Sequence, residues 1–351
     1  MITDYNWIDD NSDLEALILS IKKTDIVAFD SEFERVNTFY PKPALFQLKI
    51  GSDYYLIDMK EITNHDVFKT LLNNIILHSG SEDLEILYNL NKQLPSQIFD
   101  TQVAASLCGY GLHFSYQNIV NELLGIELSK AHSRSDWMQR PLTKAQLNYA
   151  LEDVIYLPEL KSILQDELKR LGREEWYNLL IEQRKASIIN SNHVDKTYVK
   201  IAKAKRFTHQ QQQLLYALLQ WREETAISRN KPRPWILKND EIVNIIYKQP
   251  NTEKKLVDEI GLYPKFVKYN AQSIIGLYES ANEMGLDALP NYDKLTASQG
   301  TILADLKLEL NTKCEKLNIP VALVINTADL KSLVAAENDL NNIALWQLIN
   351  A

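Results

Sequence analysis

Four acidic residues and one tyrosine, spread over three segments, have the residue types needed for chemistry on an anionic substrate. Asp30 and Glu32 lie in the first segment, Asp83 in the second, and Tyr149 and Asp153 in the third. Two divalent ions ~4 Å apart can activate a water, orient a phosphate and stabilise a leaving oxyanion. Mg²⁺ prefers oxygen ligands, which carboxylates supply. The set therefore predicts a two-metal site for phosphodiester hydrolysis.

The spacing within each segment indicates the element that must position it. Asp30 and Glu32 are two residues apart in an apolar run, so both should point to one face of a strand. Tyr149 and Asp153 are four residues apart in a helical pattern, so both should lie on one face of a helix. Asp83 follows an apolar strand-like run and opens a helical pattern. A strand, a helix and a turn would together supply the five groups.

Each segment taken alone also fits an ordinary structural role. An aspartate at the end of a strand is usually a solvated edge residue. Ser79 and Glu82 fit a capping box, in which an acid favours a helix N-terminus. Tyr149 and Asp153 alone fit a half-buried helix surface. Only the combination of all three segments favours catalysis.

Further sequence surrounds these residues and carries a family resemblance. The blocks are Phe29-Asp30-Ser31-Glu32-Phe33 with Tyr40-Pro41 and Leu45-Phe46-Gln47-Leu48; His78-Ser79-Gly80-Ser81-Glu82-Asp83-Leu84-Glu85 with Phe99-Asp100-Thr101-Gln102; and Lys130, Ser133-Arg134-Ser135-Asp136-Trp137, Arg140-Pro141-Leu142-Thr143, Tyr149 and Asp153-Val154. Together they resemble the motifs of the ribonuclease D family, which belongs to the DEDD 3′→5′ exonucleases with a tyrosine in the third motif. The resemblance implies a ribonuclease H-like fold and a metal-dependent exonuclease.

The resemblance also implies a role for each residue of the set. Asp30, Glu32, Asp83 and Asp153 would be ligands of two divalent ions, Mg²⁺ or Mn²⁺, and Tyr149 would position the attacking water. A phenol with a pKa near ~10 is a poor general base at neutral pH. Orienting the water is therefore the more economical role for the tyrosine, since a metal can lower the pKa of that water.

Other residues of the three blocks are candidates for gripping the 3′ end of a nucleic acid. They are Phe33, His78, Lys130, Arg134 and Trp137. Apolar and aromatic groups can stack on bases, and cations can hold phosphates. Trp137 fits a core position equally well.

The net charge of −8 is unusual for a protein that binds nucleic acid. Residues 181–240, however, hold 12 Lys and Arg against 5 Asp and Glu, a local balance of +7. Within this segment we expect Arg229, Lys231 and Arg233 to contact phosphates. A solvated basic face is an equally weighted alternative.

Composition allows several domains and excludes some classes of protein. The chain has 351 residues, of which 45% are hydrophobic and 24% charged, as in ordinary globular proteins. The polar, acidic residues 1–11 and the lack of 18 consecutive apolar residues predict neither a signal peptide nor a membrane span. Cys108 and Cys314 fit reduced thiols of a cytoplasmic protein. Nothing indicates an obligate protein partner.

The order of apolar patterns predicts an α/β domain followed by all-α domains. Thr143 and Gln146 form a capping-box pattern, and Pro158 predicts a break near residues 156–157. The strands expected are 26–33, 44–50, 54–57 and 75–78, and the helices are 82–90, 101–107, 116–124 and 143–171. We assign residues 1–186 to the exonuclease domain.

Residues 187–207 lack a regular apolar period and are expected to form a linker. Helical patterns follow at 209–228, 240–247, 252–260 and 264–283, and a repeat with an offset of 88 residues relates Pro232 to Pro320. Residues 208–288 resemble an HRDC domain, a small helical module that helps hold nucleic acid. Residues 289–351 resemble a divergent second HRDC-like domain, which is either truncated or ends with its last helix. Two unrelated helical hairpins sharing a proline turn are the alternative.

Together with the family resemblance, these patterns predict a metal-dependent 3′→5′ exoribonuclease that releases nucleoside 5′-monophosphates from structured RNA. The resemblance implies tRNA precursors as substrates. Two alternatives stay open: a 3′→5′ DNA exonuclease of the repair or proofreading type, and a non-catalytic RNA-binding scaffold. The active-site residues alone do not distinguish RNA from DNA, because none of them identifies a reader of the 2′-hydroxyl.

Overall fold

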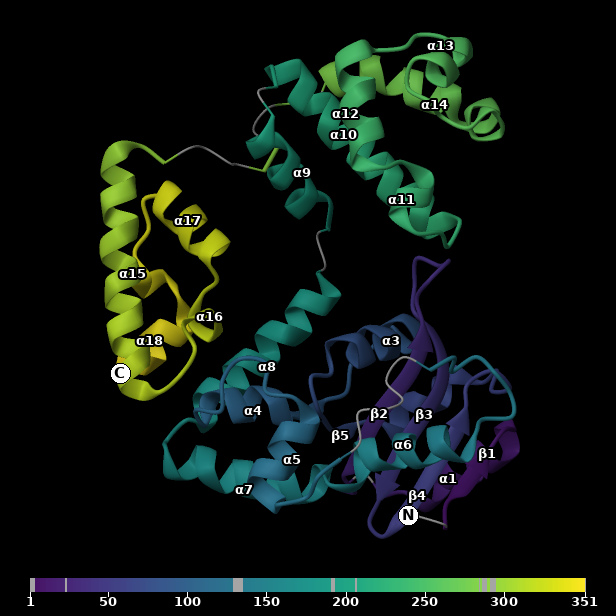
Figure 1. Ribbon diagram of the computed structural model, residues 1–351, viewed down its shortest axis with the longest axis vertical. Coiled ribbons are helices and arrows are strands. Elements are labelled where there is room, and N and C mark those ends of the chain that lie inside the picture. The colour runs from purple at the N-terminus through teal and green to yellow at the C-terminus, as the bar shows by residue number, and fades with distance from the viewer. Residues whose placement is uncertain are drawn as a thin grey trace. The chain divides into compact units, whose positions relative to one another are not determined.

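The computed structural model describes residues 4–22, 24–128, 135–190, 193–205, 207–283, 285, 289–290 and 295–350 (Figure 1). The chain divides into two compact units. Unit 1 comprises Met1–Glu34, Pro41–Asn190 and Leu295–Ala351, and unit 2 comprises Arg35–Tyr40 and Ser191–Lys294. Both cysteines are free, as expected. Within the described residues, no helix is long and apolar enough to cross a membrane.

Unit 1 is built on a mixed sheet whose strands lie in the order β1-β4-β3-β2-β5-β6. The central strand β2 pairs with β5 in parallel and with β3 in antiparallel orientation. Its residues 27–29 are buried, because strands pair along both of its edges and helices pack on the sheet. The strands are β1 (Asn6–Ile8), β2 (Val27–Glu34), β3 (Lys42–Ile50), β4 (Asp53–Asp58), β5 (Asn74–Leu77) and β6 (Gln97–Asp100).

All four expected strands are therefore present, and β1 and β6 were not predicted. Both are short, with 3 and 4 residues, so neither shows enough alternation to be recognised. They pair in parallel with β4 and β5 respectively. Their existence depends on partners that only the folded sheet provides.

The helices of unit 1 cover the sheet, and α6 packs on β2 and β3 (Figure 1). The predicted capping box of Thr143 and Gln146 starts α6, and the predicted break before Pro158 separates α6 from α7 at Tyr156. The helices are α1 (Asn11–Ser20), α2 (Phe68–Leu71), α3 (Ser81–Asn91), α4 (Thr101–Leu107), α5 (Tyr116–Leu124), α6 (Lys144–Ile155), α7 (Leu157–Arg170) and α8 (Glu174–Ile189), with a 3-10 turn at His65–Val67.

Unit 2 is helical, and it includes most of the segment that was expected to be a linker. Helix α9 occupies His193–Ala204, and its Tyr198 and Ile201 belong to the core of unit 2. The linker prediction for 187–207 is wrong in this respect, because the many lysines on the exposed side of α9 obscure its apolar period. The remaining helices are α10 (His209–Ser228), α11 (Arg233–Ile236), α12 (Asn239–Lys248), α13 (Glu253–Asp258) and α14 (Pro264–Asn282).

The 88-residue repeat appears in the structure as a repeated series of elements. Capping boxes start α10 at Thr208 and α15 at Thr296, and the proline turn is followed by the short helices α11 and α16. The C-terminal helices nevertheless belong to unit 1: Arg173 donates to the Leu317 carbonyl at 2.7 Å. These helices are α15 (Ala297–Leu317), α16 (Val321–Val324), α17 (Thr327–Ala335) and α18 (Ala344–Asn350), with a 3-10 turn at Leu340–Asn342.

Candidate active site

Strand β2 and helix α6 bring three of the predicted acids together. Asp30 and Glu32 are on one face of β2, and Asp153 is near the C-terminal end of α6. Each of the three offers a carboxylate oxygen, and these oxygens all lie within 4.8 Å of one another. The two acids of the strand and the acid of the helix therefore come together, because α6 packs across β2 and β3.

Asp83 enters the site from the first turn of α3 and is held differently. Its carboxylate accepts a hydrogen bond from Ser31, which lies between the two acids of β2. It is not one of the three acids whose oxygens lie within 4.8 Å, but its negative charge contributes to raising the pKa of Asp30. Burial raises the pKa of Asp83 to about 6, against the opposing effect of the Ser31 hydrogen bond. All four acids thus share one electrostatic environment.

The site concentrates more negative charge than its surroundings can stabilise. Burial, followed by repulsion from Asp153 and Asp83, raises the pKa of Glu32 to about 9. Burial is also the largest cause for Asp153, whose pKa is raised to about 8, and for Asp30, whose pKa lies well above its usual range. Without counterions these carboxyl groups tend to hold protons. Divalent cations would offset both effects by supplying positive charge.

Tyr149 lies one helical turn before Asp153 on α6 and donates a hydrogen bond to it. The tyrosine ring packs beside the Trp137 ring, with centroids 6.0 Å apart. Burial, followed by the negative charges of Asp153 and Glu32, raises the pKa of the Tyr149 phenol. The hydroxyl therefore stays protonated and can act as a hydrogen-bond donor but not as a base.

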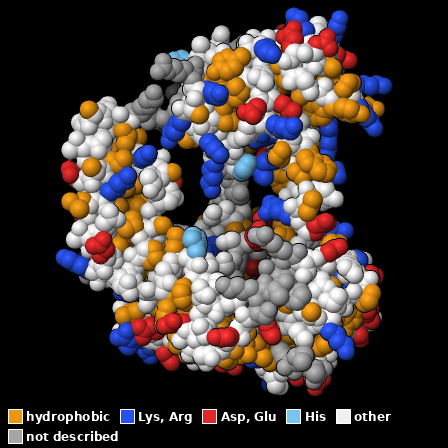
Figure 2. Space-filling model, in the orientation of Figure 1, with side chains coloured by type: hydrophobic (Ala, Val, Ile, Leu, Met, Phe, Trp, Pro, Cys, Tyr) orange, Lys and Arg blue, Asp and Glu red, His pale blue; other side chains and the backbone are white. Residues whose placement is uncertain are grey.

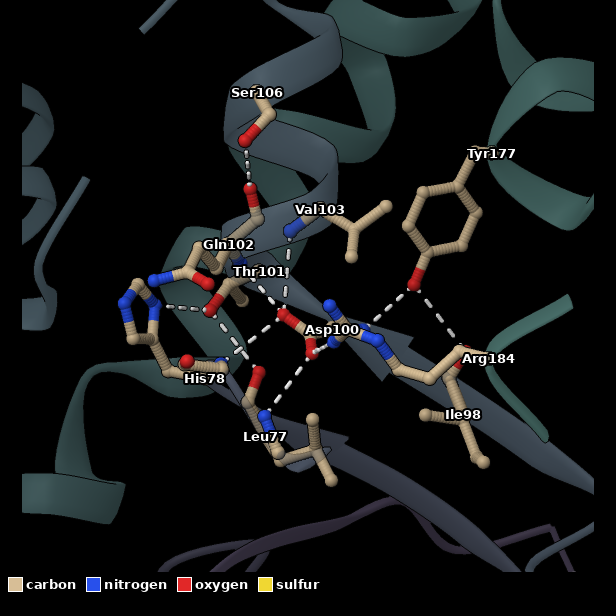
Figure 3. Close-up of polar contacts among 12 residues, drawn as sticks. Leu77, His78, Ile98, Asp100, Thr101, Gln102, Val103, Ser106, Tyr177 and Arg184 are labelled. Carbon is tan, nitrogen blue, oxygen red and sulfur yellow. Dashed lines mark hydrogen bonds and ion pairs between the residues drawn. The ribbon is translucent and has the colours of Figure 1, made fainter. Parts of the chain in front are cut away.

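The loop before α3, which carries Asp83, is anchored by the buried Asp100 at the end of β6 (Figure 3). The Asp100 carboxylate accepts hydrogen bonds from the backbone N–H groups of Ser79 and Gly80, both at 3.1 Å, and from the first turn of α4. It also pairs with Arg184 of α8. In the sequence, Asp100 is only one residue of the second motif block, and its role in anchoring this loop was not predicted.

The conformation of this loop explains its residue types. Ser79 has a φ of 59°, in the left-handed region that a non-glycine residue adopts at a cost. The bond to Asp100 offsets this cost. At Gly80, an added Cβ would lie 2.3 Å from a methyl carbon of the buried Leu77, so a larger residue would require this side chain or the loop to shift. The predicted capping box of Ser79 and Glu82 is absent, because Gly80 is the N-cap and makes no side-chain bond.

The second-rank candidates have mixed outcomes. Trp137 is 4% exposed and packs in a core with Leu142 and Leu151, which is the alternative that its pattern left open. Both ring nitrogens of His78 are used inside the fold, near Thr101 Oγ1 at 2.9 Å and the Phe114 carbonyl at 3.1 Å.

Phe33 is half-buried and packs partly against the core of unit 1. Lys130 and Arg134 lie outside the described residues. We therefore retain Phe33 and set aside His78 and Trp137 as contacts of a substrate.

Gln47 is a member of the site region that pattern analysis did not single out. It lies directly opposite Asp30 in the ladder between β2 and β3, so both side chains are on the same face of the sheet. Its side chain is fully buried, and neither amide atom has a partner within the described part of the chain. The available signal was a glutamine within the otherwise apolar run of β3, 44–48.

In unit 2, two of the three predicted phosphate contacts are used internally. Arg233 makes two bonds of 2.5 Å to the Glu223 carboxylate, and its guanidinium lies 4.4 Å from the centre of the Phe39 ring. Arg229 donates to Asn270 at 2.8 Å. Lys231 is exposed, and its ammonium lies 5.7 Å from the centre of the Trp235 ring. Of the three, Lys231 is best placed to meet a ligand.

Comparisons with known proteins agree with this fold. A model described as a 3′-5′ exonuclease matches residues 5–169, and a model described as an HRDC domain matches residues 211–278. Ribonuclease D of Shewanella sp. (strain ANA-3) is 30% identical over 91% of this chain and 84% of its own. Ribonuclease D of Bartonella henselae is 30% identical over 93% of this chain and 82% of its own.

A solved structure of a ribonuclease D shows the same fold. The crystal structure of Escherichia coli RNase D has a TM-score of 0.85 and 26% identity, covering 95% of this chain and 91% of that chain. The catalytic core of RRP6 from Trypanosoma brucei shares the fold, with a TM-score of 0.61 and 19% identity over 82% of each chain.

The mixed sheet, with acids contributed by β2, α3 and α6, defines a 3′→5′ exonuclease domain, here followed by a helical HRDC domain. This confirms the predicted fold class. The chain belongs to the ribonuclease D family. It is a 3′→5′ exoribonuclease, and enzymes of this exonuclease family depend on metal.

Proposed function

We propose that this exoribonuclease trims the 3′ ends of structured RNA, with tRNA precursors as its main substrates, and releases nucleoside 5′-monophosphates. The observation that carries the catalytic part is the meeting of three carboxylates, from β2 and α6, within 4.8 Å. The RNA class is supported by the relative from E. coli, whose structure is described as that of an exoribonuclease involved in structured RNA processing.

The residues of the site fit divalent cations. Their donor atoms are carboxylate oxygens, which Mg²⁺ and Mn²⁺ accept. The raised pKa of Glu32 and of Asp153 indicates charge that a cation would compensate. We assign Asp30, Glu32, Asp83 and Asp153 as the ligands of two ions. When bound, the ions would supply a water of lowered pKa and positive charge near the leaving oxygen.

The protein's own groups have separate tasks in this proposal. Ser31 holds the Asp83 carboxylate by a hydrogen bond, which fixes the acid that is farther from the other three. Tyr149, kept protonated by burial and by its acidic neighbours, orients the attacking water. Phe33 is half-buried beside Glu32 on β2 and can contact the terminal nucleotide.

One assay compares this proposal with its alternatives. A 5′-labelled tRNA precursor with an extended 3′ end, a single-stranded RNA and a single-stranded DNA are each incubated with Mg²⁺ or Mn²⁺, with and without chelator. We expect stepwise shortening of both RNAs, mononucleotide products and complete inhibition by the chelator. Faster shortening of DNA would favour the DNA exonuclease. Binding of RNA without shortening, under any metal condition, would favour the scaffold.

A further inference from the structure

Unit 2 contains a cavity of about 620 Å³ that has no assigned role. Its walls come from α9, from α10, from the starts of α11 and α12, and from the segment Arg35–Tyr40. This segment belongs to unit 2 although it lies between β2 and β3 in the sequence. The volume is within the usual range of ligand sites. The basic residues of its lining are Arg35, His193, Lys196, Lys200, Arg222 and Arg233.

The lining of this cavity is strongly basic. Five of its members carry a permanent positive charge, and none of the described lining residues is acidic. Burial, followed by the positive charges of Arg233 and other cations nearby, lowers the pKa of His193. The cavity therefore has a positive potential that favours an anion. Lys and Arg side chains recur across the visible face of unit 2 (Figure 2).

One of these cations is buried and forms no ion pair with a carboxylate among the described residues, although the charge of Glu223 is near enough to act on it. Arg222 is 4% exposed, and its Nη1 donates to the Leu237 carbonyl at 3.2 Å and to Asn239 Oδ1 at 2.7 Å. Its Nε has no partner among the described residues. A buried charge that meets only neutral acceptors is costly, so a bound anion would stabilise it.

The walls of the cavity are held in place by contacts within unit 2. Asn230 Oδ1 accepts from the backbone N–H of Phe39 at 3.0 Å and of Tyr40 at 3.2 Å. Arg233 lies over the Phe39 ring and is fixed by Glu223. The cavity is thus formed before a ligand arrives, and binding requires little ordering of its walls.

We propose that this cavity binds a phosphodiester group of the RNA substrate, through Lys196 and Lys200 at its rim and Arg222 at its base. Lys, Arg and Thr are typical phosphate contacts, and they position a nucleic acid without reading its sequence. The assignment rests on the proposed function, because it takes RNA as the ligand. It replaces Arg229 and Arg233 as the main phosphate contacts of unit 2.

The test measures RNA binding under conditions where no hydrolysis occurs. A fluorescein-labelled RNA hairpin with a 3′ overhang is titrated with full-length protein in EDTA at several salt concentrations. The variant Lys196→Ala/Lys200→Ala is compared with Lys254→Ala/Lys265→Ala, which removes the same charge from exposed positions of unit 2 outside the cavity. All four lysines are exposed, so neither pair of substitutions should disturb the fold. The melting temperature of each variant checks this.

We expect the cavity variant to bind RNA roughly tenfold more weakly and to lose about one to two units of salt slope, while the control stays close to wild type. Equal losses in both variants, or none in either, would overturn the proposal. Displacement of the RNA by micromolar AMP or inorganic phosphate, in wild type but not in the cavity variant, would also overturn it and indicate a small phosphorylated ligand. A wild-type protein that binds RNA here but does not shorten it would contradict the proposed function alone.

Discussion

Asp100 and Arg184 form an ion pair inside unit 1 although 84 residues separate them in the sequence. The Asp100 side chain is fully buried, whereas Arg184 is 25% exposed. The pair joins the end of β6 to α8, and the same carboxylate holds the loop before α3 (Figure 3). The position of Asp83 in the site therefore depends on a helix that contributes no acid to it.

Removing Asp100 should cost more than removing Arg184. Asp100→Ala leaves several buried N–H groups without an acceptor and breaks the ion pair, so we expect a loss of about 3–5 kcal/mol in the free energy of unfolding. Arg184→Gln leaves Asp100 with its backbone donors and should cost about 2 kcal/mol. Denaturant unfolding of both variants measures the difference. Equal losses would mean that the backbone bonds contribute little.

Asp30→Asn should abolish turnover while leaving the fold intact. The substitution removes one proposed ligand charge and also relieves repulsion among the clustered carboxylates. We therefore expect no detectable shortening of RNA and a melting temperature in EDTA at least equal to that of the wild type. Glu34→Gln, on the same strand and outside the acidic cluster, is the matched control. An Asp30→Asn protein with near-normal activity would contradict the two-metal assignment.

Tyr149→Phe keeps the ring beside Trp137 and deletes only the hydroxyl. If the hydroxyl acts mainly in the transition state, kcat should fall on the order of 100-fold with little change in RNA or metal binding. Single-turnover rates and binding titrations separate the two effects. A preserved kcat with weaker RNA binding would instead assign the tyrosine to substrate contact.

The metal-free protein should lose stability as pH rises. The pKa of Glu32 is raised from 4.5 to about 9 and that of Asp153 from 3.8 to about 8, so the folded state binds more protons than the unfolded state between these values. The melting temperature in EDTA should therefore fall from about pH 5 to about pH 9, and Mg²⁺ should restore it most at high pH.

The variant Glu32→Gln isolates this contribution from other titrating groups, because it cannot lose a proton. Its melting temperature in EDTA should depend less on pH than that of the wild type, and Mg²⁺ should stabilise it less. If the melting temperatures of the two proteins depend on pH in the same way, Glu32 does not titrate in this range, and other groups of the protein already compensate the charge of the acidic cluster.

Lys231 and Arg233 should respond differently to replacement by alanine. Arg233 pairs with Glu223 and lies over Phe39, so Arg233→Ala should destabilise unit 2 by about 1–3 kcal/mol. Lys231 is exposed and should change stability by less than about 0.5 kcal/mol. Thermal and denaturant unfolding measure both. A stable Arg233→Ala variant with much weaker RNA binding would restore Arg233 as a primary phosphate contact.

The sequence by itself determined the local geometry of the groups that we propose as catalytic. Asp30 with Glu32, and Tyr149 with Asp153, lie on common faces because the periods of a strand and a helix are properties of the backbone. The break before Pro158 follows from its ring and missing N–H in the same way. The family resemblance also depends on such local patterns and is confirmed by the comparisons.

Only the tertiary structure decided which distant groups meet. Ser31 with Asp83, and Asp100 with Arg184, are pairs whose spacing carries no local signal. Packing also placed Trp137 in the core, although its pattern fitted a surface that stacks bases equally well. Periodicity tells which way a side chain faces within its own element. What it faces depends on long-range packing, which is a property of the whole chain.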